Sequence, residues 1–359
     1  MKRWLLENDK VRVGVTEEGG HLGPVAFRTE RGEIAPMHVA PWAGETLSPD
    51  IPPILQILQG DFFCAPFSDS DLIPDEDRPH GTTANDRWRE VAIRDDRLTL
   101  ELAKRVMGAM VQKHLHIRPG ECMVYQQHDF IGGDGALPVG HHAMLRVPET
   151  VTLSFSKWLF GATPPAPVET PPAGRSLLGY PQRFEDLAHV ELADGSVADM
   201  SRYPTLERHE DLLMVIADPS LPFAWSAVTA PEHGWVWFSL KSPRTLRGTM
   251  LWLSHGGRDY PPFSGRHTHV LGVEEVTSYF HLGHRASVEA NAFSDRGVPT
   301  ALTLSPDQTL SIRYAFGLVT IPPQFESVKA IEAHPGGVLL RGNQGLEVFT
   351  PCDLGFITG

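Results

Sequence analysis

The segment Arg78–Trp88 gathers residue types that recognise sugars. It reads Arg-Pro-His-Gly-Thr-Thr-Ala-Asn-Asp-Arg-Trp, so the imidazole of His80, the amide of Asn85 and the indole of Trp88 lie close together in the sequence. Sugar hydroxyls need paired hydrogen-bond donors and acceptors, and the apolar face of a sugar ring packs on an aromatic side chain. The segment is therefore a candidate carbohydrate site, although the same residues would also suit an ordinary surface loop.

Two other segments carry residues that could transfer a proton. His141 and His142 are adjacent, and the segment 267–277 contains the neighbouring acids Glu274 and Glu275. A histidine has an ordinary pKa near 6.5, so it can give or take a proton near neutral pH. Burial raises the pKa of a carboxyl group and can make it a general base. Because side chains alternate along a strand, one of the two acids must face inward. Glu274 is favoured as the base, with Glu275 as the alternative.

A metal site of the cupin type is an alternative use of the same residues. His267, His269 and Glu274 are ligand types that suit a divalent metal held on strands. The segment that ends at His142 weakly resembles the second cupin element, but it precedes the first element and its histidine is one residue early. On a strand, His267 and His269 would share a face that Glu274 does not share. This spacing counts against the metal site.

The elements that must position these residues are predicted to be strands. The 33 glycines and 31 prolines interrupt the chain at short intervals, and many short alternating segments separated by turns indicate a large antiparallel β sandwich or barrel. The segments 111–118 and 121–128 predict a hairpin with a Pro-Gly turn. Further strands are predicted at 267–281 and 285–292. A parallel α/β fold would need recurring helices between strands, and those are missing.

Composition narrows the classes of function. A hydrophobic share of 41% and a charged share of 21% are typical of a globular protein. The formal charge of −13, without a basic run, counts against nucleic acid and anionic membranes as partners. The three cysteines are too far apart for a disulfide framework or a metal knuckle. With no signal peptide and no membrane-spanning segment in the sequence, we expect a cytoplasmic protein.

The order of the motifs resembles the aldose 1-epimerase (galactose mutarotase-like) superfamily. The resemblance covers residues 5–320 approximately, and each motif alone is weak, whereas their common order is more specific. In chain order the motifs are Gly19-Gly20-His21-Leu22, Pro79-His80-Gly81 with Asn85 and Trp88, Pro119-Gly120, Gly140-His141-His142, Leu271-Gly272-Val273-Glu274 and Leu310-Ser311-Ile312-Arg313-Tyr314.

The resemblance implies a β-supersandwich over residues 1–320, with 321–359 as a C-terminal β extension on the same domain. It also implies that a monosaccharide of the aldohexose type binds to the concave face and that no metal or cofactor takes part. Glu274 would be the base that takes the proton of the anomeric hydroxyl, and His142 the acid that protonates the ring oxygen. His80 would hydrogen-bond the same region of the ring.

The substrate contacts are less well defined by the resemblance. Many relatives have an arginine shortly after the proline of the first apolar run, but here Pro66 is followed by Phe67. Its loss counts against a sugar phosphate, and Arg78 or Arg87 is the expected substitute. Asn85 and Trp88 are further expected contacts, and Arg258, in a glycine-rich loop, is expected to line the cleft. A sugar-binding protein without catalysis stays an alternative, as a monomer or a homodimer, and the sequence does not select the sugar.

Overall fold

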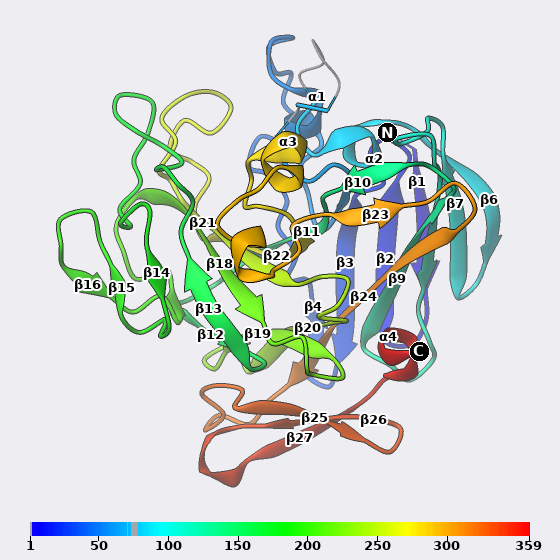
Figure 1. The fold of residues 1–359 in the computed structure, drawn as a ribbon. Coiled ribbons are helices and arrows are strands. Elements are labelled where there is room, and N and C mark those ends of the chain that lie inside the picture. The colour runs from blue at the N-terminus through cyan, green and yellow to red at the C-terminus, as the bar shows by residue number, and fades with distance from the viewer. Residues whose placement is uncertain (1, 70, 73–77) are drawn as a thin grey trace.

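In the computed structural model, which describes residues 2–69, 71–72 and 78–359, two large sheets form the body of the protein (Figure 1). The seven-stranded sheet has the order β14 (Arg183–Phe184), β13 (Trp158–Ala162), β18 (His209–Ala217), β21 (Gly248–His255), β22 (Val270–Thr277), β11 (Val139–Arg146) and β5 (Phe63–Cys64). The nine-stranded sheet has the order β17 (Arg202–Tyr203), β12 (Val151–Phe155), β19 (Ala224–Ala230), β20 (Trp235–Lys241), β24 (Thr309–Thr320), β9 (Met123–Ile131), β8 (Met110–His116), β7 (Arg97–Leu102) and β6 (Trp88–Arg94).

Smaller sheets complete the strand inventory of the described residues. They are a four-stranded sheet of β1 (Arg3–Glu7), β2 (Val11–Thr16), β3 (Leu22–Thr29) and β4 (Gly32–Ile34), the pairs β10 (Gly135–Leu137) with β23 (Leu302–Leu304) and β15 (Val190–Glu191) with β16 (Val197–Ala198), and a C-terminal sheet of β25 (Ala330–His334), β26 (Gly337–Arg341) and β27 (Glu347–Pro351). Every ladder between these named strands is antiparallel. The predicted all-β, antiparallel class is confirmed.

Helices are short and lie between strands. They are α1 (Pro53–Gln56), α2 (Gly81–Asn85), α3 (Gly283–Val288) and α4 (Gly355–Thr358), with the 3₁₀ turns η1 (Ser294–Arg296) and η2 (Asn343–Gly345). No helix in the described ranges has the length and apolar character that crossing a membrane requires. The three cysteines are unpaired thiols.

The predicted hairpin at 111–128 is confirmed, but the strand predicted at 285–292 is wrong. In the hairpin, β8 pairs with β9 and Gly120 turns the chain at φ 80°. At 285–292 the structure has α3 instead. The carboxylate of Asp71 accepts hydrogen bonds from the backbone N–H groups of His284 (2.6 Å) and Arg285 (2.7 Å). An acceptor at the first turn stabilises a helix, and this one comes from a distant part of the chain.

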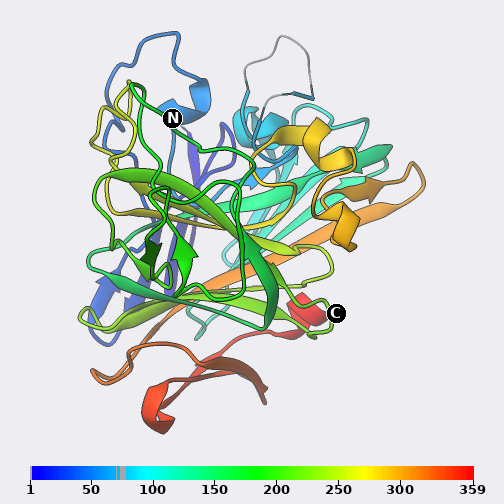
Figure 2. The same cartoon turned by 60° about the vertical axis from the view of Figure 1, so that its left-hand side comes forward.

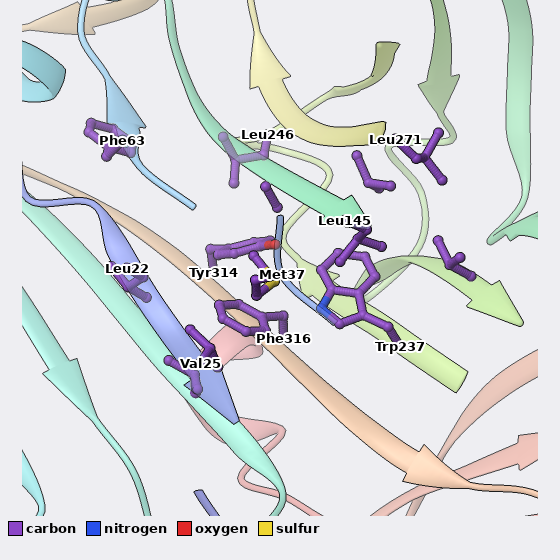
Figure 3. Packing of buried hydrophobic residues seen from close by; sticks show 14 of the residues in the cluster. Leu22, Val25, Met37, Phe63, Leu145, Trp237, Leu246, Leu271, Tyr314 and Phe316 are labelled. Carbon is purple, nitrogen blue, oxygen red and sulfur yellow. The ribbon is translucent and has the colours of Figure 1, made fainter. Parts of the chain in front are cut away.

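The main core lies where the seven-, nine- and four-stranded sheets face each other, and all three supply buried apolar side chains. Figure 3 shows Tyr314 and Phe316 of β24 gathered with Val25 of β3 and Leu145 of β11. A second apolar cluster covers the other face of the seven-stranded sheet and includes side chains from the α1 segment and the turn after β22. That second face carries the candidate site.

The C-terminal sheet packs on the outer face of the nine-stranded sheet. Ile331, Val338 and Leu340 of this sheet share a buried cluster with Trp225 and Phe238. In Figures 1 and 2 these strands, coloured orange to red, lie at the lower end of the molecule, away from α1. The division of the chain at residue 320 stays a prediction, and it falls at the end of β24.

Candidate active site

His142 and Glu274 are brought together by the pairing of β11 with β22. The antiparallel register places the two residues directly opposite each other, and the Nε2 atom of His142 lies 3.3 Å from Oε1 of Glu274. The side chains are 6% and 1% exposed. Directly opposed residues on one face of a β pair are close neighbours, so two strand positions far apart in sequence form one buried acid–base pair.

The same alternation turns His141 and Glu275 to the opposite face, between the sheets. There the Glu275 carboxylate pairs with the ammonium group of Lys241 and accepts a hydrogen bond from Ser239 Oγ at 2.7 Å. His141 Nδ1 lies 3.2 Å from a carboxylate oxygen of Asp61. Both acids are therefore buried, each on its own face, whereas the sequence analysis expected only one to face inward. Glu274 is the acid that lines the cavity.

His80 approaches the pair from the turn before α2. Its ring centroid lies 4.8 Å from that of His142, with the rings almost perpendicular. The backbone of His80 is left-handed, with φ 68°, a conformation that histidine adopts more readily than bulky residues do. Gly81 follows at φ 70°, and a Cβ atom there would lie 2.3 Å from the carbonyl oxygen of Ala65. Only glycine fits this close approach, which fixes the position of His80.

A buried thiol contacts the imidazole of His80. Cys64 Sγ lies 3.4 Å from His80 Nδ1, and burial raises the pKa of this thiol well above 9.0. Because the thiol stays protonated, it can donate its hydrogen to Nδ1, and in that arrangement the imidazole proton lies on Nε2. Burial also lowers the pKa of His80 to about 3, and the nearby His21, His281 and Arg258 act in the same direction. His80 is thus a neutral hydrogen-bond donor.

These groups line a cavity of about 480 Å³. Its polar lining residues are Ser68, His80, His142, Arg258, Tyr260, Glu274 and His281, and its apolar lining residues are Ile51, Pro52, Ile54, Leu55, Leu58, Pro79, Val168, Leu212, Met250, Trp252, Pro261 and Phe263. The seven-stranded sheet forms the floor, because Leu212, Met250 and Trp252 come from β18 and β21, whose places beside β22 and β11 are visible in Figure 1.

The Glu274–His142 pair holds one proton. Burial lowers the pKa of His142 well below 6.5, and the neighbouring imidazole of His80 acts in the same direction. Burial raises the pKa of Glu274 well above 4.5, and the charge of Asp61 reinforces this shift. The pair is therefore neutral as a whole. Moving its proton from Glu274 to His142 creates a carboxylate base next to an imidazolium acid without exchange with solvent.

Arg258 reaches the cavity wall, but its charge is already balanced. The Nε atom lies 2.8 Å from Glu169 Oε1 and 3.3 Å from Glu210 Oε1. The guanidinium group also lies over the rings of Trp252 and Phe263, at 5.6 and 4.7 Å from their centroids. A guanidinium held by two carboxylates has little attraction left for an anionic ligand.

Three of the expected substrate contacts lie outside the cavity lining. Asn85 donates hydrogen bonds from Nδ2 to the carbonyl oxygens of Pro79 and Gly81, both at 2.8 Å, and so holds the turn that carries His80. Trp88 is 1% exposed, and its indole N–H donates to the Thr83 carbonyl. Trp88 thus packs in the core, where aromatic side chains supply much of the buried area of a β protein, and its contact with a sugar stays a prediction.

Arg78 also points elsewhere. Its guanidinium donates to a carboxylate oxygen of Asp86 at 2.6 Å, and no atom of Arg78 lines the cavity. Arg78, which we expected to replace the missing arginine, thus forms an ion pair with Asp86 in the turn between α2 and β6. Arg258 is the arginine that reaches the cavity.

The three residues of the metal alternative do not converge. His267 Nδ1 lies 2.7 Å from Ser254 Oγ, and its ring stacks on Trp252 at 5.2 Å. His269 has a left-handed backbone, so the alternation of side chains along β22 does not extend back to it. It also lines a different cleft from the one that Glu274 lines. In the described part of the chain, no group of three or more His, Cys, Asp and Glu side chains could hold a metal ion.

The sequence reasoning missed most of the cavity wall. Trp252, Tyr260 and His281 were not predicted as site residues, and neither was the buried carboxylate of Glu210. Met250 and Trp252 occupy alternate positions of β21. Only the pairing of β21 with β22, which sets Met250 opposite Glu274, brings that face to the site.

No family model matches this sequence, and no curated protein matches it either. Solved structures match it in fold. A protein of Escherichia coli K12, provisionally described as an aldose 1-epimerase, superposes with a TM-score of 0.62 at 12% identity, covering 89% of this chain and 99% of its own. A galactose mutarotase related enzyme from Lactobacillus acidophilus gives 0.56 at 11% identity, covering 89% and 98%. A galactose mutarotase-like protein from Lactobacillus casei gives 0.55 at 12% identity, covering 89% and 100%. The galactose mutarotase-like β fold predicted from the motifs is confirmed.

Proposed function

We propose that the protein is an aldose 1-epimerase-like isomerase that interconverts the anomers of a sugar by acid–base ring opening. The observation that carries this proposal is the meeting of Glu274 and His142, with His80 beside them, in one cavity. The fold supports it, because the structural neighbours described above include proteins named for this reaction. Fold alone does not specify an activity, so the argument depends on the chemistry of the three side chains.

The spacing of the pair suits the reaction. The anomeric oxygen and the ring oxygen of a cyclic sugar are both bonded to C1, so a base and an acid must act on two atoms that are close together. Glu274 Oε1 and His142 Nε2, 3.3 Å apart, are such a base and acid. Glu274 Oε2 and His142 Nδ1 have no hydrogen-bond partner in the described part of the chain, so the carboxylate keeps an oxygen for a sugar hydroxyl.

The steps use only the proton that the pair already holds. When that proton is on His142, the Glu274 carboxylate accepts the proton of the anomeric hydroxyl while His142 donates its own to the ring oxygen. The C1–ring oxygen bond breaks, and C1 becomes the aldehyde carbon. C1 then rotates, and the ring hydroxyl adds to the opposite face as the two protons return. Proton transfer by positioned groups of this kind accelerates a reaction by about 10²–10⁴-fold.

Supporting roles follow for the other polar groups. His80 Nε2–H donates to the ring oxygen as charge develops there, and Cys64 keeps the proton on that nitrogen. Asn85 positions His80 through the turn. Arg258 presents its remaining N–H groups to sugar hydroxyls and holds the wall of the cavity together.

Polarimetry of freshly dissolved α-anomers of D-glucose and D-galactose tests the proposal. We expect the protein to accelerate the approach to anomeric equilibrium, and His142→Ala and Glu274→Gln to lose about 100-fold or more of the rate. His189→Ala is the matched control, because His189 is an exposed histidine outside the cavity lining. Circular dichroism and thermal unfolding verify that each variant is folded.

A sugar-binding protein without catalysis is the competing function. A wild-type protein that binds either sugar but leaves the rate of anomer exchange unchanged would establish this alternative and refute the isomerase proposal. Equal rates for His142→Ala and the wild type would refute the assigned acid while leaving the activity.

A further inference from the structure

We propose that the preferred ligand of this cavity is a neutral sugar that carries an apolar substituent remote from the anomeric carbon, such as an alkyl group on the C6 oxygen. This inference concerns the substrate class and rests on the proposed function for its sugar ring, but not on turnover. Three features of the cavity lead to it: a large apolar part of the lining, a smaller set of polar lining groups and a neutralised arginine.

The apolar wall runs from the α1 segment to the loop after β21. Ile51, Pro52, Leu55 and Val168 are only partly buried, and Pro261 is exposed, yet all of them line the cavity. Ile54, buried in the second apolar cluster, fixes the α1 segment in place. Apolar side chains that keep contact with solvent at a cavity mouth indicate a ligand that covers them.

The polar groups lie at other positions of the lining. Ser68, His80 and His281 keep partial exposure, while His142 and Glu274 form the buried end. An unsubstituted hexose carries hydroxyls all around its ring. The hydroxyls that faced the apolar wall would lose water without gaining partners, which is unfavourable. A ligand with one polar and one apolar part matches both sets of lining groups.

The size of the cavity agrees with a ligand that has one polar and one apolar part. A volume of about 480 Å³ falls in the range of pockets that hold drug-sized ligands, so it can hold more than a bare sugar ring. With the anomeric carbon at the buried pair of Glu274 and His142, the rest of the ligand extends toward the partly exposed lining residues, which include Leu55 and Val168. The substituent must therefore be attached away from C1, which also leaves the anomeric hydroxyl free to react.

The ligand is expected to be neutral. Arg258 is the arginine of the lining, and it is held by Glu169 and Glu210. A carboxylate or phosphate on the sugar would compete with two protein carboxylates for that one cation and would add negative charge near Glu274. Anionic sugars of the uronate or sugar phosphate class should therefore bind weakly.

Calorimetric titration of the full chain with matched sugars tests the inference. The probes are D-galactose, 6-O-butyl-D-galactose and D-galacturonate, with the corresponding D-gluco set run in parallel. In at least one set we expect the butyl ether to bind at least about 10-fold more tightly than its parent sugar, because the wall covers part of the alkyl chain, and the uronate to bind more weakly than the parent.

Leu55→Asn should reduce the preference for the butyl ether to below about 3-fold, because it replaces an apolar lining residue that we expect to cover the alkyl chain. Leu159→Asn is its control, since Leu159 is an exposed leucine outside the cavity lining, and it should keep the full preference. Parent sugars that bind as tightly as their ethers, or no binding of any probe, would overturn the inference.

Polarimetry separates this inference from the proposed function. Anomer exchange without the binding preference would reject the inference and leave the isomerase proposal standing. A binding preference without anomer exchange would do the reverse.

Discussion

At the scale of single residues, the candidate site depends on which groups stay neutral. His80 is kept neutral by burial and contacts the Cys64 thiol through Nδ1, and Glu274 shares one proton with His142. The sequence supplied these residue types, and the family resemblance supplied their assigned roles. The contact of His80 with Cys64 could not be predicted, because nothing in the sequence around Cys64 distinguishes a thiol that faces an imidazole from an ordinary core cysteine.

The shared proton predicts a broad pH–rate profile. Adding a second proton gives the pair a net positive charge and removing the only proton gives it a net negative charge, and burial disfavours both. The acid limb, on which His142 gains a proton, should therefore lie well below 6.5, and the alkaline limb, on which Glu274 loses its proton, well above 4.5. The measurement is kcat/KM for anomer exchange from pH 4 to 9, corrected for the uncatalysed rate. A rate that rises with an apparent pKa near 6.5 would contradict a neutral, one-proton pair.

At the scale of elements, strand alternation decides which residues reach the site. The sequence predicted a strand around Glu274 and proposed His142 as its partner, but alternation alone left two acids to choose from. The choice follows from the register of β11 with β22, which puts Glu274 and His142 on the cavity face and Glu275 with His141 on the other. The α1 wall and Val168 could not be predicted, because loops of unrelated sequence converge there only in the folded chain.

The turn at α2 gives a prediction at this scale. Gly81→Ala should destabilise the protein by about 3 kcal/mol or more, because a Cβ atom would lie 2.3 Å from the Ala65 carbonyl oxygen in a left-handed backbone. Gly120→Ala is the matched control: Gly120 is also left-handed, but no heavy atom lies within 4 Å of its Cβ position, so we expect a loss of about 1 kcal/mol. Urea unfolding measures both, and equal losses would contradict the steric explanation.

At the scale of the whole molecule, burial of many histidines makes stability depend on pH. Burial lowers the pKa of His21 and of His38 to about 4, whereas in the unfolded chain each has the ordinary value near 6.5. Between pH 6.5 and 4 the unfolded chain therefore binds protons that the native protein does not. The free energy of unfolding falls as the pH falls through this window. Glu274, whose pKa is raised, opposes the trend.

A single substitution isolates this effect. His38→Leu should reduce the loss of stability between pH 7 and pH 5 by about 2 kcal/mol, the contribution of one histidine whose pKa moves from 6.5 to about 4. Urea midpoints of the wild type and the variant at both pH values provide the measurement. His189→Ala, at an exposed histidine, should leave the difference between the two pH values unchanged. A His38→Leu variant with the full wild-type difference would exclude His38 as a source.

The ammonium group of Lys241, buried between the sheets, pairs with Glu275, the residue next to the base. A shift of β22 by one residue would exchange the faces of Glu274 and Glu275. Lys241 would then lose its counter-ion, and Glu274 would point away from the cavity. The ion pair between Lys241 and Glu275 therefore stabilises the register of β22 that places Glu274 in the cavity on the other face of the sheet. If the proposed function holds, replacing Lys241 should lower the rate of anomer exchange, although Lys241 does not line the cavity.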